Sequence, residues 1–169
     1  MFNMLYNEVM PAFKTDPRVD MLFQNVPQPW HPQSCYQHEA GMAVKLVDES
    51  KFYAASSKIF AAQDKFADKS CIDMSRNQCY DSLADIVTDG TGVDRQSVMD
   101  QLKLDKGDTS IGHNVTLMIK FSAKYHRVRG VHVTPTVFLN GVEAPDVGSG
   151  WTAEQWKEKI TACLENSKL

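Results

Sequence analysis

Pro135 lies inside the strand-like run GVHVTPTVFLNGVE at residues 130–143, and it limits what this segment can fold into. The alternating β-branched residues predict extended backbone, and the dipeptide Asn140-Gly141 predicts a tight hairpin turn. Proline lacks a backbone N–H, so strands accept it only at edges, first positions and bulges. A cis bond between Thr134 and Pro135, which turns the backbone as the strand begins, is one way to accommodate it. The segment therefore predicts a proline turn followed by a hairpin.

Helical patterns dominate the rest of the chain. Apolar residues at helical spacing predict a helix over residues 2–13, which Pro11 kinks or ends. The run RVDMLFQNV at residues 18–26 instead predicts a short strand that the following PQP stops. Apolar stripes predict further helices within residues 34–47, 50–66, 75–87, 94–102, 115–125 and 152–164. This order predicts a single α/β domain over residues 1–169, with a helical block inserted at about residues 34–128.

Polar residues mark several of the expected helix ends. The capping-box pattern, a Ser or Thr followed three residues later by Gln, occurs at Ser34, Ser75 and Thr152. Asp94 is expected to cap a further helix start, and Gly130 is expected to end the helix before the proline run. These signals predict helix boundaries independently of the apolar stripes.

The stretch PWHPQSCYQHEA at residues 29–40 contains three side chains that bind metals or react as nucleophiles. His31, Cys35 and His38 are spaced four and three apart, which would place them on one face of a helix. They admit three interpretations: a metal site, a reactive thiol with its base, or the start of a buried helix. A metal site would also need a fourth ligand or an open position, and hydrogen-bond partners for both imidazoles.

The expected helix start favours the structural interpretation of this stretch. Pro32 and the capping Ser34 place the start after His31, so the three side chains would not share one face. We therefore expect a strand-to-helix corner, packed by Trp30 and held by a hydrogen bond of His31, and no metal site. Cys35 would then be the first helical residue, where a helix N-terminus lowers a thiol pKa.

Composition excludes several classes of function. Lysine and arginine are scattered and the net charge is −3, so no nucleic-acid surface is predicted. The apolar runs are too short to span a bilayer, so no membrane partner is predicted. The N-terminal sequence MFNMLYNEVMPAF has no basic region, so it is not expected to be a signal peptide, and the compartment is left unassigned. No phosphate-binding loop is present, and no cofactor is predicted.

The cysteines do not form a recognised pattern. There are four of them, too few for a disulfide scaffold, and none belongs to a Cys-x-x-Cys motif. Cys71 and Cys79 could pair if the loop between them folds back, and free, half-buried thiols are the alternative. The sequence leaves both possibilities open.

Two segments resemble a known family. The run VTPTVFLNG at residues 133–141 closely resembles the cis-proline strand and hairpin of DsbA-like thioredoxin-fold proteins. The stretch QPWHPQS at residues 28–34, with HEA at residues 38–40, is similar to a subgroup of these proteins. The resemblance covers essentially the whole chain. It implies an α/β, thioredoxin-like fold of the DsbA type, with a helical insertion before the cis-proline strand and an incomplete N-terminus.

The resemblance does not extend to the family's catalytic motif. Such proteins begin with a strand, followed by a Cys-x-x-Cys or a degenerate version of it at the start of the first helix, whereas this chain is expected to begin inside that helix. No catalytic residue is therefore carried over. The resemblance implies only that Thr134 and Pro135 present backbone to an extended substrate peptide. His132 and Val133 are further candidates to line that groove.

Three functions remain open at this stage, and so does the question of whether the chain is an enzyme. The first is a protein related to thiol–disulfide oxidoreductases that has lost redox catalysis together with its motif. The second is a non-catalytic module that binds a peptide or partner protein at the cis-proline groove. The third is a glutathione-using transferase or isomerase of the DsbA-related kind. The expected partner is a protein or peptide, and the oligomeric state is not indicated.

Overall fold

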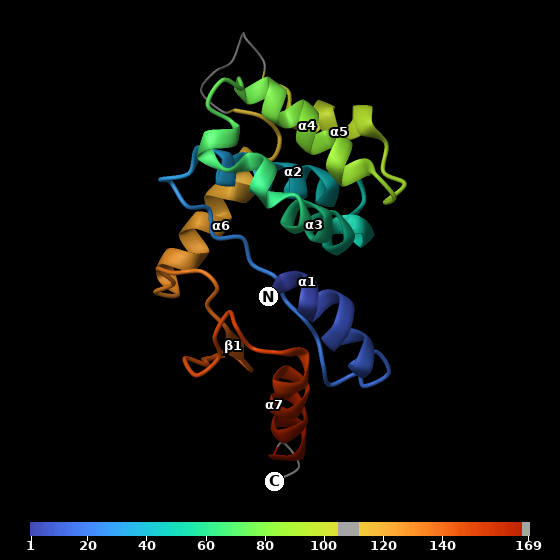
Figure 1. The fold of residues 1–169 in the computed structure, drawn as a ribbon, viewed down its shortest axis with the longest axis vertical. Coiled ribbons are helices and arrows are strands. Elements are labelled where there is room, and N and C mark those ends of the chain that lie inside the picture. Colours follow the sequence, from blue (N-terminus) through green and yellow to red (C-terminus); the bar gives the residue numbers. More distant parts are fainter. Residues whose placement is uncertain (105–111, 167–169) are drawn as a thin grey trace. The chain divides into compact units, whose positions relative to one another are not determined.

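The computed structural model describes residues 1–104 and 112–166. The chain divides into two compact units (Figure 1). One unit combines Met1–Phe23 with Val131–Leu169, and the other is Gln24–Gly130. The predicted helical insertion falls within the second unit. That the two units act as a single domain stays a prediction.

The first unit begins with a helical segment whose winding changes along its length. An α-helical turn, α1 (Phe2–Met4), leads into a π-helical turn at Leu5–Val9 and a 3-10 turn at Met10–Phe13. Pro11, which lacks the N–H that an α-helix needs, lies in the 3-10 turn and accounts for the end of regular winding. The unit closes with α7 (Ala153–Asn166). Its apolar core consists of Val9, Ala144, Val147 and Trp156.

The predicted hairpin is present in this unit. Strand β1 (Phe138–Leu139) pairs antiparallel with β2 (Val142–Glu143). Asn140 and Gly141 form the turn with φ angles of 50° and 83°, the positive values that a two-residue hairpin turn requires. The bond between Thr134 and Pro135 is cis. The sequence therefore located both the turn and the unusual peptide bond.

The strand predicted at residues 18–26 is wrong. Residues 19–28 are irregular, and within the described residues the sheet contains only β1 and β2. Local acceptors satisfy backbone groups at the start of this segment, since Asp16 accepts from the N–H of Arg18 and Asp20 accepts from that of Met21. Such short-range bonds compete with strand pairing. The α/β prediction is thus met only in part, because the described residues are mostly helical and contain a small sheet of two strands.

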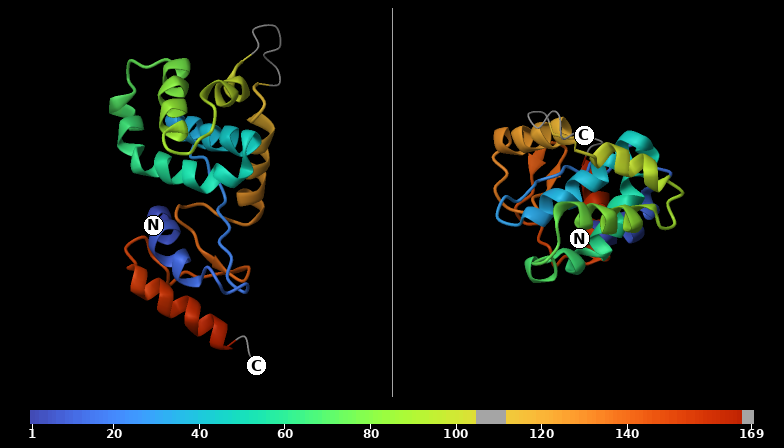
Figure 2. Two further views of the ribbon diagram at one scale, coloured as in Figure 1. Left: turned by 90° about the vertical axis from the view of Figure 1, so that its right-hand side faces the viewer. Right: turned by 90° about the horizontal axis from the view of Figure 1, so that it is seen from above.

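In the second unit, residues 24–104 and 112–130 form a bundle of five helices with three short 3-10 turns. The helices are α2 (Pro32–Val47), α3 (Phe52–Ala61), α4 (Arg76–Thr88), α5 (Arg95–Leu102) and α6 (Thr116–Val128). The 3-10 turns are Glu49–Lys51, Gln63–Phe66 and Asp68–Ser70. Helix α2 contacts each of the other four helices, and Figure 2 shows it among them. Small buried residues, Ala40, Gly41 and Ala43, allow this close approach.

Most of the predicted helix boundaries are confirmed. Ser75 forms a complete capping box at the start of α4, Asp94 caps α5, and Gly130 follows α6 with a φ of 70°. Thr152 and Gln155 exchange the reciprocal hydrogen bonds of a capping box before α7. The capping box predicted at Ser34 is wrong, because α2 already begins at Pro32. Proline fits the first helical position, where its missing N–H costs nothing.

Candidate functional site

The cis-proline loop, residues 132–136, precedes β1 and contains the residues for which the family resemblance implies substrate binding. His132, Val133, Thr134 and Pro135 are all exposed. The side chain of Val133 is prominent among them, with 68% of the residue exposed. The four candidates therefore form one continuous accessible stretch of chain. Their role in binding stays a prediction.

Two hydrogen bonds hold the loop at its C-terminal end. The hydroxyl of Thr136 donates to the carbonyl of Val133 at 2.7 Å, which closes the loop on itself. The N–H of Ala144 donates to the carbonyl of Val137 at 2.9 Å and ties the loop to the hairpin. Val137 also packs against the core of its unit. The loop is thus anchored at one end while its apex faces solvent.

The apex of the loop offers backbone groups for a further partner. Within residues 1–104 and 112–166, no hydrogen bond involves the backbone N–H or carbonyl of Thr134. Exposed main-chain groups of this kind bind an extended peptide by adding it as a strand. Pro135 contributes a carbonyl but no N–H. Chemically, the loop can bind the main chain of a polypeptide.

The structure assigns the two histidines of the 29–40 stretch to different partners. His31 precedes α2 as its N-cap, and its Nδ1 lies 3.0 Å from Oδ2 of Asp68. His38 lies within α2, and its Nδ1 is 2.9 Å from Oδ1 of Asn25. The predicted hydrogen bond of His31 is confirmed. In the described part of the chain, no group of three His, Cys, Asp or Glu residues could hold a metal ion.

Two further predictions for this corner are wrong. Trp30 does not pack the corner, since 64% of it is exposed. Cys35 is the fourth residue of α2 and not the first, because the helix starts at Pro32. Burial and the nearby charge of Glu39 raise the pKa of the Cys35 thiol. Cys35 therefore lacks the low pKa of a nucleophilic thiol.

The other thiols do not supply a reactive pair either. Within the described residues no disulfide bond is present, and Cys71 and Cys79 are buried in the core of the helical unit. Burial, together with the adjacent Cys71, raises the pKa of Cys79 to about 11. A thiol with so high a pKa stays protonated near neutral pH and attacks disulfides slowly.

A buried polar network, not foreseen from the sequence, lies between α2, α4 and the start of α6. The hydroxyl of Tyr80 donates to Oε2 of Glu39 at 2.6 Å. Nη2 of Arg76 lies 3.3 Å from Oε1 of Glu39, and Nε2 of His113 lies 3.0 Å from the Tyr80 hydroxyl. Glu39, Tyr80 and His113 are all buried, while Arg76 is partly exposed.

The groups of this network satisfy one another. Burial alone would raise the pKa of Glu39, but hydrogen bonds from His113 and Tyr80 and the charge of Arg76 lower it overall. Burial and the hydrogen bond to Glu39 raise the pKa of Tyr80. The network therefore holds an ionised carboxylate in place and stabilises the helical unit. The only sequence signal for it was the spacing of four between Arg76 and Tyr80, which places them on one face of a helix.

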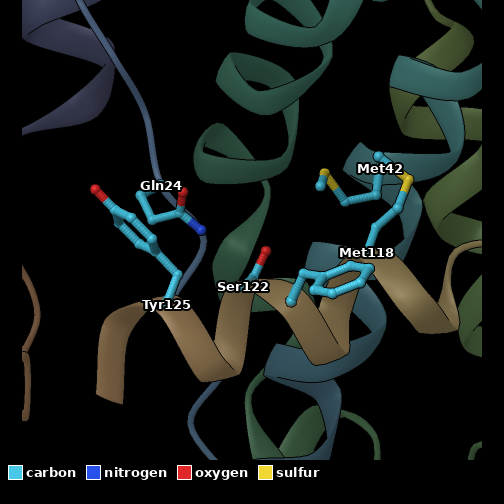
Figure 3. A pocket seen from close by; sticks show the side chains of 6 residues that line it. Gln24, Met42, Met118, Ser122 and Tyr125 are labelled. Carbon is cyan, nitrogen blue, oxygen red and sulfur yellow. The ribbon is translucent and has the colours of Figure 1, made fainter. Parts of the chain in front are cut away.

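A groove lies beside α6 in the same unit. It has a volume of about 350 Å³, and Figure 3 shows several of the side chains that line it. Met118, Ser122 and Tyr125 come from α6, Met42 comes from α2, and Gln24 comes from the segment before α2. Phe121 of α6 completes the lining. The groove is mostly apolar and open to solvent.

Among the described helices, none is long and apolar enough to cross a membrane.

The described residues form a mostly helical protein with a small two-stranded sheet, and this fold is similar to that of one solved structure. The matching structure comes from Pseudomonas syringae and is described as a putative protein-disulfide isomerase. The match covers 81% of this chain and 72% of that chain, with 19% sequence identity and a TM-score of 0.61. At this identity the likeness shows the fold alone. No family model and no curated protein matches the sequence.

Proposed function

We propose that this chain is a thioredoxin-like protein of the DsbA type that binds extended polypeptide at its cis-proline loop. We further propose that it does not perform two-cysteine disulfide exchange by itself. The observation that carries the proposal is the exposed loop apex, where the backbone groups of Thr134 have no partner among the described residues. The likeness in fold to the Pseudomonas syringae protein supports it.

Binding at the loop would rest on the peptide main chain. Hydrogen bonds to the backbone of an added strand give affinity, while side-chain pockets give specificity. The loop offers its main-chain groups together with the exposed apolar side chains of Val133 and Pro135. The expected ligand is therefore an unfolded or extended segment, chosen with little sequence preference.

The proposal that the chain does not perform two-cysteine disulfide exchange rests on the spacing and the pKa values of its cysteines. The two-cysteine reaction needs a nucleophilic thiolate and a second cysteine that resolves the mixed disulfide. The sequence contains no Cys-x-x-Cys, and the pKa values of Cys35 and Cys79 are raised. Neither thiol can therefore supply the nucleophile that this reaction requires near neutral pH.

Peptide binding is tested with a fluorescein-labelled peptide of about ten residues, long enough to extend past the loop as a strand. Fluorescence anisotropy is expected to show saturable binding of the unmodified peptide. A matched peptide that is N-methylated at alternate residues is expected not to bind, because N-methylation removes the donors of an added strand. A large excess of glutathione is expected to leave the bound peptide in place.

Two variants locate the binding site. Val133→Asp places a charge at the loop and is expected to weaken binding about tenfold. Val142→Asp, at a residue of the hairpin that is 71% exposed, is the matched control and is expected to bind normally. Equal binding of both peptides, or equal binding by both variants, would contradict the proposal.

The redox half of the proposal has a separate test. The purified chain is expected to reduce insulin no faster than a variant in which all four cysteines are serine. Turnover by the unchanged chain that the four-serine variant loses would show that this half is wrong. Peptide binding would then be judged separately by anisotropy.

A further inference from the structure

Helix α6 exposes a stripe of apolar side chains. Leu117, Phe121, Tyr125 and Val128 are 54%, 65%, 55% and 87% exposed. Their spacing of four, four and three residues places them along one side of the helix. The residues that α6 buries, Ile119 and Ser122, do not belong to this stripe. A continuous exposed apolar stripe of this kind is typical of an interaction surface.

The stripe forms one wall of the groove beside α6. Phe121 and Tyr125 belong to both the stripe and the groove lining. Met42 and Met118 line the same groove, as Figure 3 shows. Methionine side chains adapt to the shape of an inserted group. The surface is therefore concave as well as apolar, and it can accept side chains from a partner.

Positive charge borders the stripe. Lys120, Lys124 and Arg127 lie on α6, and within the described residues none of them forms an ion pair. Nζ of Lys124 lies 5.8 Å from the ring centre of Phe121. No Asp or Glu occurs between Asp108 and Glu143, although the chain as a whole has a net charge of −3. The cations are thus concentrated beside the apolar stripe.

We propose that this face of α6 is the docking site for an acidic amphipathic helix of a partner protein. The apolar side chains of that helix, at spacings of three and four, would enter the groove between α6 and Met42. Its flanking Asp and Glu side chains would pair with Lys120, Lys124 and Arg127. This site is independent of the cis-proline loop.

The observations favour such a helix over two other occupants. A flat anionic bilayer cannot fill a concave groove, and the acidic remainder of the chain would oppose its approach. A second copy of this chain would bring the same cationic face against itself, because a two-fold interface pairs identical surfaces. An acidic helix complements both the shape and the charge of the site.

The test uses the full chain and a labelled peptide of about 20 residues, a length at which helices become stable. The peptide has a leucine stripe at spacings of three and four, flanked by glutamates. Fluorescence anisotropy is expected to show saturable binding that weakens with added salt. A scrambled peptide of equal composition is expected to bind at least about tenfold more weakly, because its leucines do not form a stripe.

Substitutions on the stripe are compared with matched substitutions elsewhere on the helical unit. Phe121→Ser is expected to weaken peptide binding about tenfold, because it removes an anchor of the groove. Ile72→Ser, at a residue that is 80% exposed, is expected to leave binding unchanged. Far-UV circular dichroism verifies that both variants are folded.

Reversing the charge of two lysines distinguishes specific ion pairing from nonspecific binding. The double variant Lys120→Glu, Lys124→Glu is expected not to bind the acidic peptide. It is expected to bind instead a peptide in which the glutamates are replaced by lysines. Lys65→Glu with Lys69→Glu, an equally exposed pair with the same spacing, is the control and is expected to behave like the unchanged chain.

Three results would overturn the proposal. The first is peptide binding that is indifferent to Phe121→Ser and to the charge reversal. The second is binding to phosphatidylserine vesicles that these variants abolish, without any binding of the acidic peptide, which would assign the face to a membrane. The third is a concentration-dependent dimer in sedimentation experiments that Phe121→Ser abolishes, which would assign it to a second copy.

Discussion

The cis-proline loop and the buried network of the helical unit treat polar groups in opposite ways. The loop leaves the backbone groups of Thr134 in solvent without a partner among the described residues. The network buries a carboxylate and satisfies it with Tyr80, Arg76 and His113. Unsatisfied groups are tolerated only where water or a ligand reaches them. The difference therefore separates a region that can bind from one that holds the fold together.

The largest effect is expected from Glu39→Ala. This substitution leaves Arg76, Tyr80 and His113 without their common acceptor, so the free energy of unfolding should fall by about 3 kcal/mol. Urea denaturation measures it. The matched control is Asp89→Ala, which breaks the exposed ion pair to Lys58 and should cost less than about 1 kcal/mol. Equal losses would show that burial does not distinguish the two carboxylates.

Acid should destabilise the helical unit through His38. Burial lowers the pKa of His38 to about 4, from an ordinary value of 6.5. The folded state binds a proton at His38 more weakly than the unfolded state does. The free energy of unfolding is therefore unaffected by His38 above the ordinary pKa of 6.5, and it decreases as the pH falls from there toward about 4. The loss is on the order of 2 kcal/mol.

The His38 effect is measured by urea denaturation across that pH range. His38→Gln keeps an amide near Asn25 but cannot titrate, so its stability should depend less on pH within this window. His31→Gln, at an exposed histidine, should retain the pH dependence of the unchanged chain. Glu39 adds a separate loss at lower pH, below the ordinary pKa of a glutamate, because its own pKa is lowered in the folded state. A flat profile between neutral pH and about 4 would contradict the assignment to His38.

A smaller effect should distinguish two serines that share one sequence pattern. Ser75→Ala removes a capping box and should cost about 1 kcal/mol. Ser34→Ala changes a serine inside α2, where alanine is the better helix former, so it should cost nothing. Thermal unfolding compares the two variants. A loss at Ser34 equal to that at Ser75 would restore the capping role that the sequence predicted for it.

The smallest effect on stability is expected at the loop. Thr134→Ser and Val133→Asp change exposed side chains that form no hydrogen bond or ion pair within the described residues, so the free energy of unfolding should shift by less than about 0.5 kcal/mol. Val133→Asp should nevertheless reduce peptide binding. A large loss of stability at these positions would mean that the loop, like the network, serves the fold.

The sequence predicted the features that depend on neighbouring residues. The Asn140-Gly141 turn, the caps at Ser75 and Asp94, and the Pro135 turn are all local, and all are present. The strand at residues 18–26 failed because a strand exists only where another backbone pairs with it, and apolar alternation does not report that. The prediction that Trp30 packs the corner was wrong for a related reason, since packing depends on residues far away in the sequence.

The candidate site was only partly predictable. The cis-proline loop was located from nine consecutive residues, whereas the network joins Glu39 to Arg76, Tyr80 and His113 across more than 30 residues of sequence. The groove was missed because the apolar stripe within residues 115–125 predicted only that this segment is a helix. Phe121 and Tyr125 show that a helical stripe predicts a face and does not reveal what covers that face.

The central position of α2 has a consequence for the dynamics of the helical unit. Because α2 contacts α3, α4, α5 and α6, its amides cannot open to solvent while the other helices stay packed. Hydrogen exchange near the middle of α2 should therefore proceed only through global unfolding, whereas the ends of α6 should exchange through local fraying. The amides near the middle of α2 would then be the last in the helical unit to lose their protection.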